Sequence, residues 1–127
     1  MEKIGKSFVT LPFGEVRRIK NHLAEVVIFQ GVTMTLQDVR LYNKTLTDMH
    51  SDTFGLIVNK RYQYTYTFDA QRELIDIPNL KAVAILVYTS ASTHSTKAVL
   101  SVMRNKIEHV EIFSLRKDAI AWMEKIL

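Results

Sequence analysis

The sequence contains no cysteine, and this absence excludes disulfides, thiolate metal sites and cysteine nucleophiles. A chain without disulfides suits a reducing compartment, so we expect a cytoplasmic protein. No run approaches the roughly 18 apolar residues of a membrane helix, and no apolar segment follows residues 1–6 as it would in a signal peptide. We therefore expect neither a membrane span nor a secretory leader.

Glycine and proline are also scarce, with four and two residues respectively among 127. The sequence accordingly has no linker-like or low-complexity tract. Hydrophobic residues make up 47% and charged residues 24%, which is ordinary for a folded protein and argues against disorder. These values predict a single globular domain over residues 1–127.

The formal net charge is +4, from 17 basic and 13 acidic residues. The basic residues form small scattered groups, such as Arg17-Arg18 and Lys60-Arg61, and acidic residues lie between them. Domains that bind nucleic acid usually concentrate their basic residues in one patch. We therefore do not expect nucleic acid as a partner.

Hydrophobic periodicity predicts five strands and four helices. The clearest strand is residues 81–88, because a short continuous apolar run is typical of a strand buried on both faces. The other expected strands are residues 8–19 (bent near Pro12), 23–30, 54–59 and 109–113. The expected helices begin at Thr35 (with Asp38 completing a capping box), near Asp69 (ending before Pro78), near Ser92, and after Ser114 as the N-cap.

The order β-β-α-β-α-β-α-β-α predicts an α/β fold. We expect a mainly parallel five-stranded sheet with an N-terminal antiparallel hairpin and four helices. The hairpin would leave an edge strand that could pair with a second copy of the chain, so a homo-oligomer is compatible with this fold.

Three stretches of the sequence resemble a known family: Leu56–Arg61 with Tyr64-Thr65, residues 82–90, and residues 110–122. From about Phe13 to Leu127 the chain resembles the STAS fold, the sulfate-transporter and anti-sigma-factor-antagonist domain. It is most similar to the small stand-alone bacterial proteins of this class, whose roles are mostly undefined. The resemblance implies a non-catalytic domain that binds and regulates another protein.

In regulatory STAS proteins, a Ser or Thr beside an Asp, between the third strand and the second helix, is phosphorylated to break binding to a partner kinase. This chain departs from that pattern, because it has no Asp-Ser or Asp-Thr pair in this region. The resemblance leaves Thr65 and Thr67 as the hydroxyls in the corresponding place.

Strand-to-helix connections of a parallel sheet emerge at its carboxyl edge. We expect residues 31–35, 60–67, 89–96 and Ser114 to meet at this rim. Within and just after the second of these segments lies an aromatic ladder of Tyr62, Tyr64, Tyr66 and Phe68, whose period of two places all four on one side of an extended segment. Basic residues precede the ladder, and this combination is typical of an interface. The predicted partner-binding residues are Asn59, Lys60, Arg61, Tyr62, Tyr64 and Tyr66. One alternative is that Phe68 and one tyrosine only cover the sheet edge or core. Another is that the aromatic rings stack on nucleic-acid bases, which would use the same residue types.

The segment Thr89–Thr96 contains six hydroxyl groups just before a predicted helix. Free N–H groups at a helix start can hold an anion, and hydroxyls can complete the site. The predicted anion-binding residues are Ser90, Ser92, Thr93, His94 and Ser95. The alternative is plain N-capping by Ser92 or Thr93.

The four histidines lack metal-ligand spacing, so we expect no metal and no cofactor. His50, Ser51 and Asp52 are expected in a polar turn at the opposite rim, and no catalytic residue is predicted.

The favoured function is a non-catalytic protein-interaction or regulatory module. The alternative is a carrier or sensor of a small amphipathic or lipid-like ligand, which would need a cavity of roughly 300 Å³.

Overall fold

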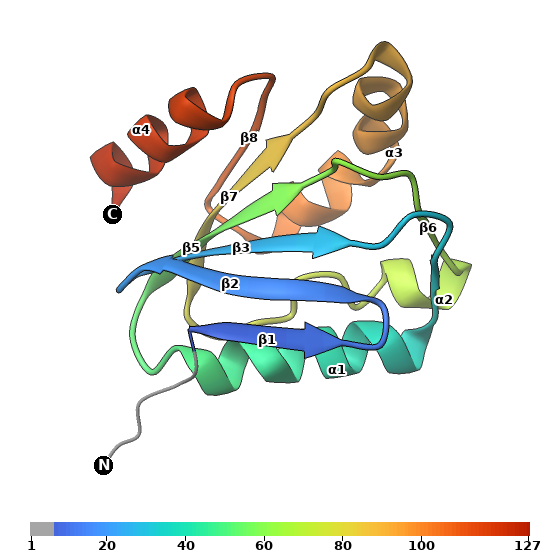
Figure 1. Ribbon diagram of the computed structural model, residues 1–127, viewed down its shortest axis with the longest axis horizontal. Helices are drawn as coiled ribbons and strands as arrows, with labels where there is room; N and C mark the ends of the chain where they lie inside the picture. Colours follow the sequence, from blue (N-terminus) through green and yellow to red (C-terminus); the bar gives the residue numbers. More distant parts are fainter. Residues whose placement is uncertain (1–6) are drawn as a thin grey trace.

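The main sheet has six strands in the spatial order β1-β2-β3-β5-β7-β8 (Figure 1). The computed structural model describes residues 7–127 apart from the side chain of Ala98, so residues 1–6, on which the expectation of no leader rested, lie outside the described residues. The strands are β1 (Phe8–Leu11), β2 (Gly14–Lys20), β3 (Leu23–Ile28), β5 (Phe54–Asn59), β7 (Leu80–Leu86) and β8 (His109–Phe113).

Strands β1 to β3 form an antiparallel meander, and β3, β5, β7 and β8 run parallel. The expected α/β fold with an antiparallel N-terminal hairpin is confirmed, but the sheet has one strand more than expected. The expected bend near Pro12 is a full reversal, with Leu11 paired to Gly14 across a two-residue turn. Gly14 suits this position, because a Cβ atom there would lie 2.4 Å from the carbonyl oxygen of Val27.

The helices are α1 (Leu36–Met49), α2 (Phe68–Gln71), α3 (Ser90–Lys106) and α4 (Arg116–Ile126). The predicted capping box of α1 is confirmed: the hydroxyl of Thr35 accepts from the N–H of Asp38 at 3.2 Å, and the Asp38 carboxylate accepts from the N–H of Thr35 at 3.0 Å. Helix α4 begins differently from the prediction, because its N-cap is Leu115 and makes no side-chain cap bond.

Helix α2 is also shorter than predicted, since it ends after a single turn and the chain continues to Pro78 in turns. The backbone of Ile75 has φ of 51°, a left-handed conformation that a helix cannot contain. The Ile75 side chain is nevertheless buried. Tertiary packing therefore overrides the local helical pattern here.

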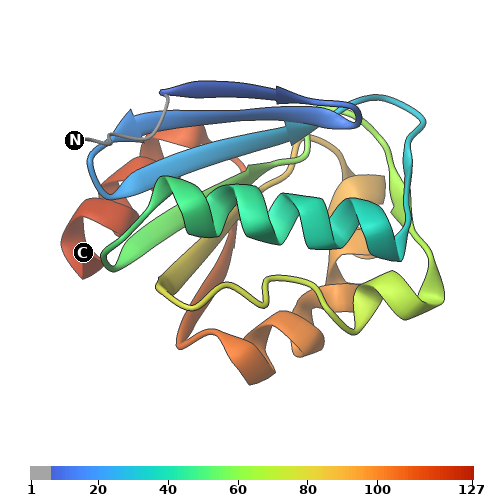
Figure 2. The same ribbon diagram turned by 90° about the horizontal axis from the view of Figure 1, so that it is seen from below.

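Successive residues of the central strands face opposite layers, as the pleat of a strand requires. Leu56 and Val58 of β5 belong to a core shared with α1 and α3, whereas Ile57 packs in a second cluster with Ala119 and Met123 of α4. Figure 2 shows α1 lying along one side of the sheet. The sheet is thus covered by α1 and α3 on one face and by α4 on the other.

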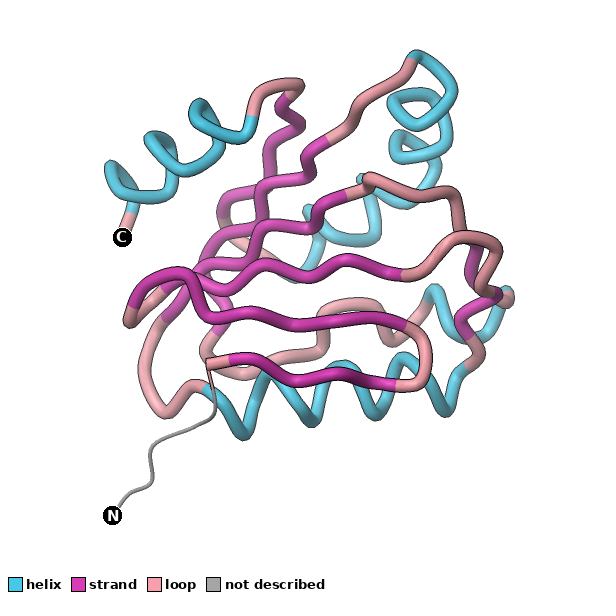
Figure 3. The backbone as a smooth tube through the Cα atoms, in the orientation of Figure 1, coloured by secondary structure: helices cyan, strands magenta, loops and turns pink. Residues whose placement is uncertain are grey.

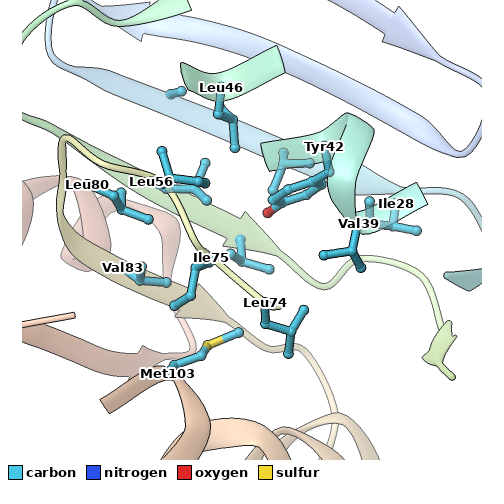
Figure 4. Close-up of a cluster of buried hydrophobic side chains, with 14 of the residues drawn as sticks. Ile28, Val39, Tyr42, Leu46, Leu56, Leu74, Ile75, Leu80, Val83 and Met103 are labelled. Atoms are coloured by element: carbon cyan, nitrogen blue, oxygen red, sulfur yellow. The ribbon is translucent and has the colours of Figure 1, made fainter. Parts of the chain in front are cut away.

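The larger core lies between the sheet and helices α1 and α3 (Figure 4). Tyr42 and Leu46 of α1 point toward Leu56 of β5, and Met103 of α3 lies near Val83 of β7. Complete burial of one such apolar side chain contributes about 1.5–3 kcal/mol. No helix in the described part of the chain is both long enough and apolar enough to cross a bilayer.

Candidate functional site

A cavity of about 400 Å³ opens at the carboxyl edge of the parallel strands. Three connectors contribute to its lining: the one after β3, the one after β5, and the start of α3. The lining residues are Gln30, Gly31, Val32, Lys60, Tyr62, Gln63, Tyr64, Thr65, Ala91, Ser92 and Ser95. The tyrosine-rich and hydroxyl-rich segments therefore lie at one rim, as their place in the predicted topology required. We call this cavity the rim pocket.

Ser114, the fourth segment expected at the rim, does not line the rim pocket. It follows β8, which is the outermost strand of the sheet beside β7. The chain then enters α4, which packs on the opposite face of the sheet from α3. The position of β8 and the crossing to the other face account for the separation.

Two of the connectors run side by side as a small parallel sheet of β4 (Thr33–Met34) and β6 (Thr65–Tyr66) (Figure 3). The N–H of Gly31 donates to the carbonyl of Gln63 at 2.8 Å, and the N–H of Thr65 donates to the carbonyl of Val32 at 3.0 Å. These backbone bonds fix one wall of the rim pocket. The sequence did not indicate this pairing, because two-residue strands have no periodicity to detect.

The predicted aromatic ladder divides into two parts. Tyr64 and Tyr66 pack edge to face, with ring centroids 5.6 Å apart, and both lie against the larger core. In contrast, Tyr62 is 38% exposed and Phe68 is 82% exposed. The alternative in which Phe68 and one tyrosine cover the sheet edge or core is therefore wrong for Phe68, whereas Tyr64 and Tyr66 do pack against the core. The chain turns between these residues, so a period of two does not place all four on one side.

Tyr42 of α1 lies beneath the Tyr64–Tyr66 pair in the same core. Burial raises the pKa of Tyr42 and of Tyr64 well above the ordinary value, and that of Tyr66 above it as well. All three phenols therefore stay protonated at neutral pH. They provide no negative charge to the rim pocket.

Lys60 follows the last residue of β5 and is 9% exposed. Its Nζ atom lies 4.5 Å from the ring centroid of Tyr64, a cation–π contact between two residues that both line the rim pocket. Within residues 7–127, Nζ makes no hydrogen bond and no ion pair. Burial lowers the pKa of Lys60, since a low-dielectric surrounding disfavours its charged form.

Arg61 and Tyr62 lie beside Lys60 but face solvent. The Arg61 guanidinium lies 5.7 Å from the ring centroid of Tyr62. These two residues form an exposed basic and aromatic surface next to the rim pocket.

Asn59 belongs to a different site from the other predicted partner-binding residues. Consecutive strand residues point to opposite faces, and Asn59 donates from Nδ2 to Glu25 Oε2 at 2.8 Å. Arg116 of α4 donates to Glu25 through Nη2 at 2.8 Å and through Nε at 3.2 Å. The hydrogen bond to Glu25 raises the pKa of Arg116. Sequence reasoning missed this cluster, although a glutamate inside the apolar run Leu23–Ile28 signalled it.

The first turn of α3 forms the third wall of the rim pocket. Its N-cap is Thr89, whose hydroxyl accepts from the N–H of Ser92 at 3.0 Å, so the expected capping by Ser92 or Thr93 is corrected. Of the five predicted anion-binding residues, Ser92 and Ser95 line the rim pocket. Ser90, Thr93 and His94 do not, and the Thr93 hydroxyl donates to the carbonyl of Thr89 at 3.0 Å.

Thr65 and Thr67, the hydroxyls indicated by the STAS resemblance, differ in their surroundings. Thr65 is exposed, and its hydroxyl lies 3.4 Å from that of Thr33. Thr67 is the N-cap of α2: its hydroxyl accepts from the N–H of Ala70 at 3.4 Å and donates to Asp69 at 2.6 Å. An aspartate therefore lies beside Thr67 in space, two residues after it in the sequence.

The turn at the opposite end of the sheet differs from the prediction in one residue. Ser51 and Asp52 are exposed, but His50 is buried and its ring stacks on Phe54 at 3.8 Å between centroids. Burial lowers the pKa of His50, which favours the neutral ring. His50 is thus a core residue rather than part of a polar turn.

Comparison with known proteins identifies no matching family and no matching curated protein. In the part of the chain that the structure describes, no three His, Asp or Glu side chains come together as a metal site would need.

Proposed function

We propose that this protein is a non-catalytic module of STAS-like type that binds another protein and has a regulatory role. The observation that carries this proposal is the exposure of Phe68, at 82%. Phe68 is the first residue of α2 and lies at a groove of about 320 Å³ between α2 and α3. Exposed aromatic side chains beside such grooves are typical anchors of protein interfaces.

The groove is lined by Phe68, Gln71, Arg72, Val102, Asn105 and Lys106, a set with two cations and no acid. Lys106 is engaged within the protein, since its Nζ contacts the Asp76 carboxylate at 2.8 Å and the carbonyl of Leu74 at 3.1 Å. Arg72 makes no ion pair within residues 7–127. We therefore infer a partner segment that places an apolar side chain against Phe68 and an acidic group near Arg72.

Thr67 gives this surface a means of regulation. Because Thr67 caps α2 immediately before Phe68, a phosphate on its hydroxyl would remove the hydrogen that Thr67 donates to Asp69 and add negative charge beside that carboxylate. Such a charge would repel an acidic partner segment from the groove. Thr65 is exposed on β6 and is the second candidate for this modification.

A photo-crosslinking amino acid tests the proposal directly. We expect p-benzoylphenylalanine at position 68 to crosslink one specific protein in cells, because the ring would be covered in the complex. Position 8 is the matched control, since Phe8 is also exposed, at 41%, and lies on strand β1. With the identified partner purified, Phe68→Asp should weaken binding at least about tenfold and Phe8→Asp should leave it unchanged.

The same crosslinked product from both positions would contradict the proposal, as would a Phe68→Asp variant that binds the partner normally. Substitution of an exposed residue should not unfold the protein. A thermal melt of each variant checks that expectation.

The rim pocket favours a second function, a carrier or sensor of a small amphipathic ligand. Its volume of about 400 Å³ lies within the range of ligand sites, and its walls combine apolar Val32 and Tyr64 with polar Gln30 and Ser92. Native mass spectrometry of protein purified from its own cells should detect a bound small molecule. A spectrum of the bare chain alone, under conditions that preserve a known weak complex, would contradict this second function.

A further inference from the structure

We propose that the rim pocket binds a small organic phosphate, with the phosphate between Lys60 and the first turn of α3 and the organic group against Tyr62 and Tyr64. This inference rests on the rim pocket being a ligand site. It does not depend on a protein partner at Phe68.

Lys60 has no opposite charge beside it. This residue is 9% exposed, it lines the rim pocket together with Tyr64, and within residues 7–127 its Nζ atom has no carboxylate partner. Removing an ammonium group from water costs free energy unless an opposite charge compensates. An anion in the rim pocket would supply that missing charge.

The start of α3 contributes free N–H groups. The N–H of Ala91, which lines the rim pocket, and that of the preceding Ser90 have no acceptor among the described residues, whereas Thr89 already satisfies the N–H groups of Ser92 and Thr93. Helix α3 is 17 residues long and has no acidic residue in its first turn. The partial positive charge of the helix terminus therefore adds to that of Lys60.

The walls around these groups carry no negative charge. None of the residues that line the rim pocket is acidic, and the half-buried Tyr64 stays protonated because burial raises its pKa, so nothing on the walls competes with a bound anion. A lysine acts as a point charge, which suits the tetrahedral phosphate. The half-exposed ring of Tyr62 and the ring of Tyr64 offer an aromatic surface for the group attached to the phosphate.

Phenyl phosphate, inorganic phosphate and benzyl alcohol are the probes for a titration followed by amide chemical shifts. We expect phenyl phosphate to bind with a Kd below about 1 mM and to shift the amide signals of Ser90, Ala91 and Ser92. Inorganic phosphate should bind at least about tenfold more weakly, since it lacks the ring, and benzyl alcohol should not bind detectably.

Two variants should remove binding for different reasons. Lys60→Met keeps the length and apolar stem of the side chain but removes the charge, and Ala91→Asp places a carboxylate where the phosphate would lie. Each should weaken phenyl phosphate binding at least about tenfold. Both should fold, because Met suits a buried position and an aspartate in the first turn of a helix is favourable.

Lys125→Met is the matched control, because Lys125 is an exposed lysine near the end of α4. It should bind phenyl phosphate like the unmodified protein. Phe68→Asp should also bind it normally, which separates this inference from the protein-partner proposal. The inference is overturned if phenyl phosphate fails to bind at 10 mM, on the order of ten times the expected Kd. It is also overturned if inorganic phosphate binds as tightly, or if Lys60→Met binds as well as Lys125→Met.

Discussion

Glu25 and Lys60 are both buried charged side chains, but among residues 7–127 only Glu25 has hydrogen-bond and ion-pair partners. Glu25 is 8% exposed and accepts hydrogen bonds from Asn59 and Arg116. Lys60 is 9% exposed, and its Nζ atom lies over the ring of Tyr64. The residues that serve these two sites, Asn59 and Lys60, are adjacent in the sequence and point to opposite faces of the sheet.

The comparison separates a structural charge from a charge that is available for binding. Glu25 joins β3 to the first turn of α4, so its partners belong to the fold. Burial lowers the pKa of Lys60, so the charged form of this side chain is disfavoured in the folded chain, and such shifted groups are common at ligand sites. Removing charge at the two sites should therefore change stability in opposite directions.

The largest effect is expected from Arg116→Met, which leaves Glu25 buried without its cation. We expect the free energy of unfolding to fall by about 2 kcal/mol in urea denaturation. This is less than for a fully buried pair, because the Arg116 side chain is 47% exposed and water can replace part of the interaction. Lys117→Met, at the exposed neighbouring position, should change stability by less than about 0.5 kcal/mol.

A double-mutant cycle sharpens this prediction. In a Glu25→Leu background, no buried carboxylate remains, so Arg116→Met should cost far less than it does alone. An equal cost in both backgrounds would show that Arg116 stabilises α4 by packing rather than by pairing with Glu25.

The second effect has the opposite sign: Lys60→Met should raise the free energy of unfolding by about 1 kcal/mol at pH 7. The pKa of Lys60 is lower in the folded chain than the ordinary 10.5, so the unfolded state holds the proton more tightly. Between the lowered pKa of Lys60 in the folded chain and 10.5, the free energy of unfolding of the unmodified protein should therefore rise with pH relative to that of Lys60→Met.

Urea denaturation of both proteins at pH 7 and at a pH just above that window measures this difference. The advantage of Lys60→Met should be complete at pH 7 and lost at the higher pH. An advantage that does not depend on pH would mean that the ammonium charge of Lys60 is not the source of the cost.

The smallest effect is expected at His50, a buried titratable side chain at the other end of the sheet. Its folded pKa lies below 6.5, so the unfolded chain takes up the proton first as the pH falls and stability is lost from about pH 7 downward. His50→Phe should reduce this loss by less than about 1 kcal/mol between pH 8 and pH 5. Identical pH profiles of stability for the two proteins would contradict the prediction.

Local patterns predicted the parallel strands and the start of α1 well. Strand β8 spans His109–Phe113 as expected, because alternation and flanking polar residues define its ends. The capping box of Thr35 and Asp38 was equally readable, since both partners lie within one turn. Such features depend on residues that are close in the sequence.

The errors lie where distant segments meet. Helix α2 ends at Gln71, and the chain then turns so that Ile75 is buried with a left-handed backbone. The reversal at Pro12 depends on the close approach of Gly14 to β3. The rim pocket was expected only as a meeting of loops, and neither its volume nor the burial of Lys60 could be derived from spacing.

The sequence by itself determined the order of strands and helices, the sharing of one sheet edge by several connectors, and the chemical types of the side chains there. These follow from periodicity and from the handedness of parallel crossovers. Only the tertiary structure decided that Phe68 faces solvent, that Glu25 acquires Arg116 as a partner, and that Lys60 contacts the ring of Tyr64 but no carboxylate among the described residues. The reason is physical: burial and charge pairing depend on which distant side chains share the same space, and local propensity carries no information about that.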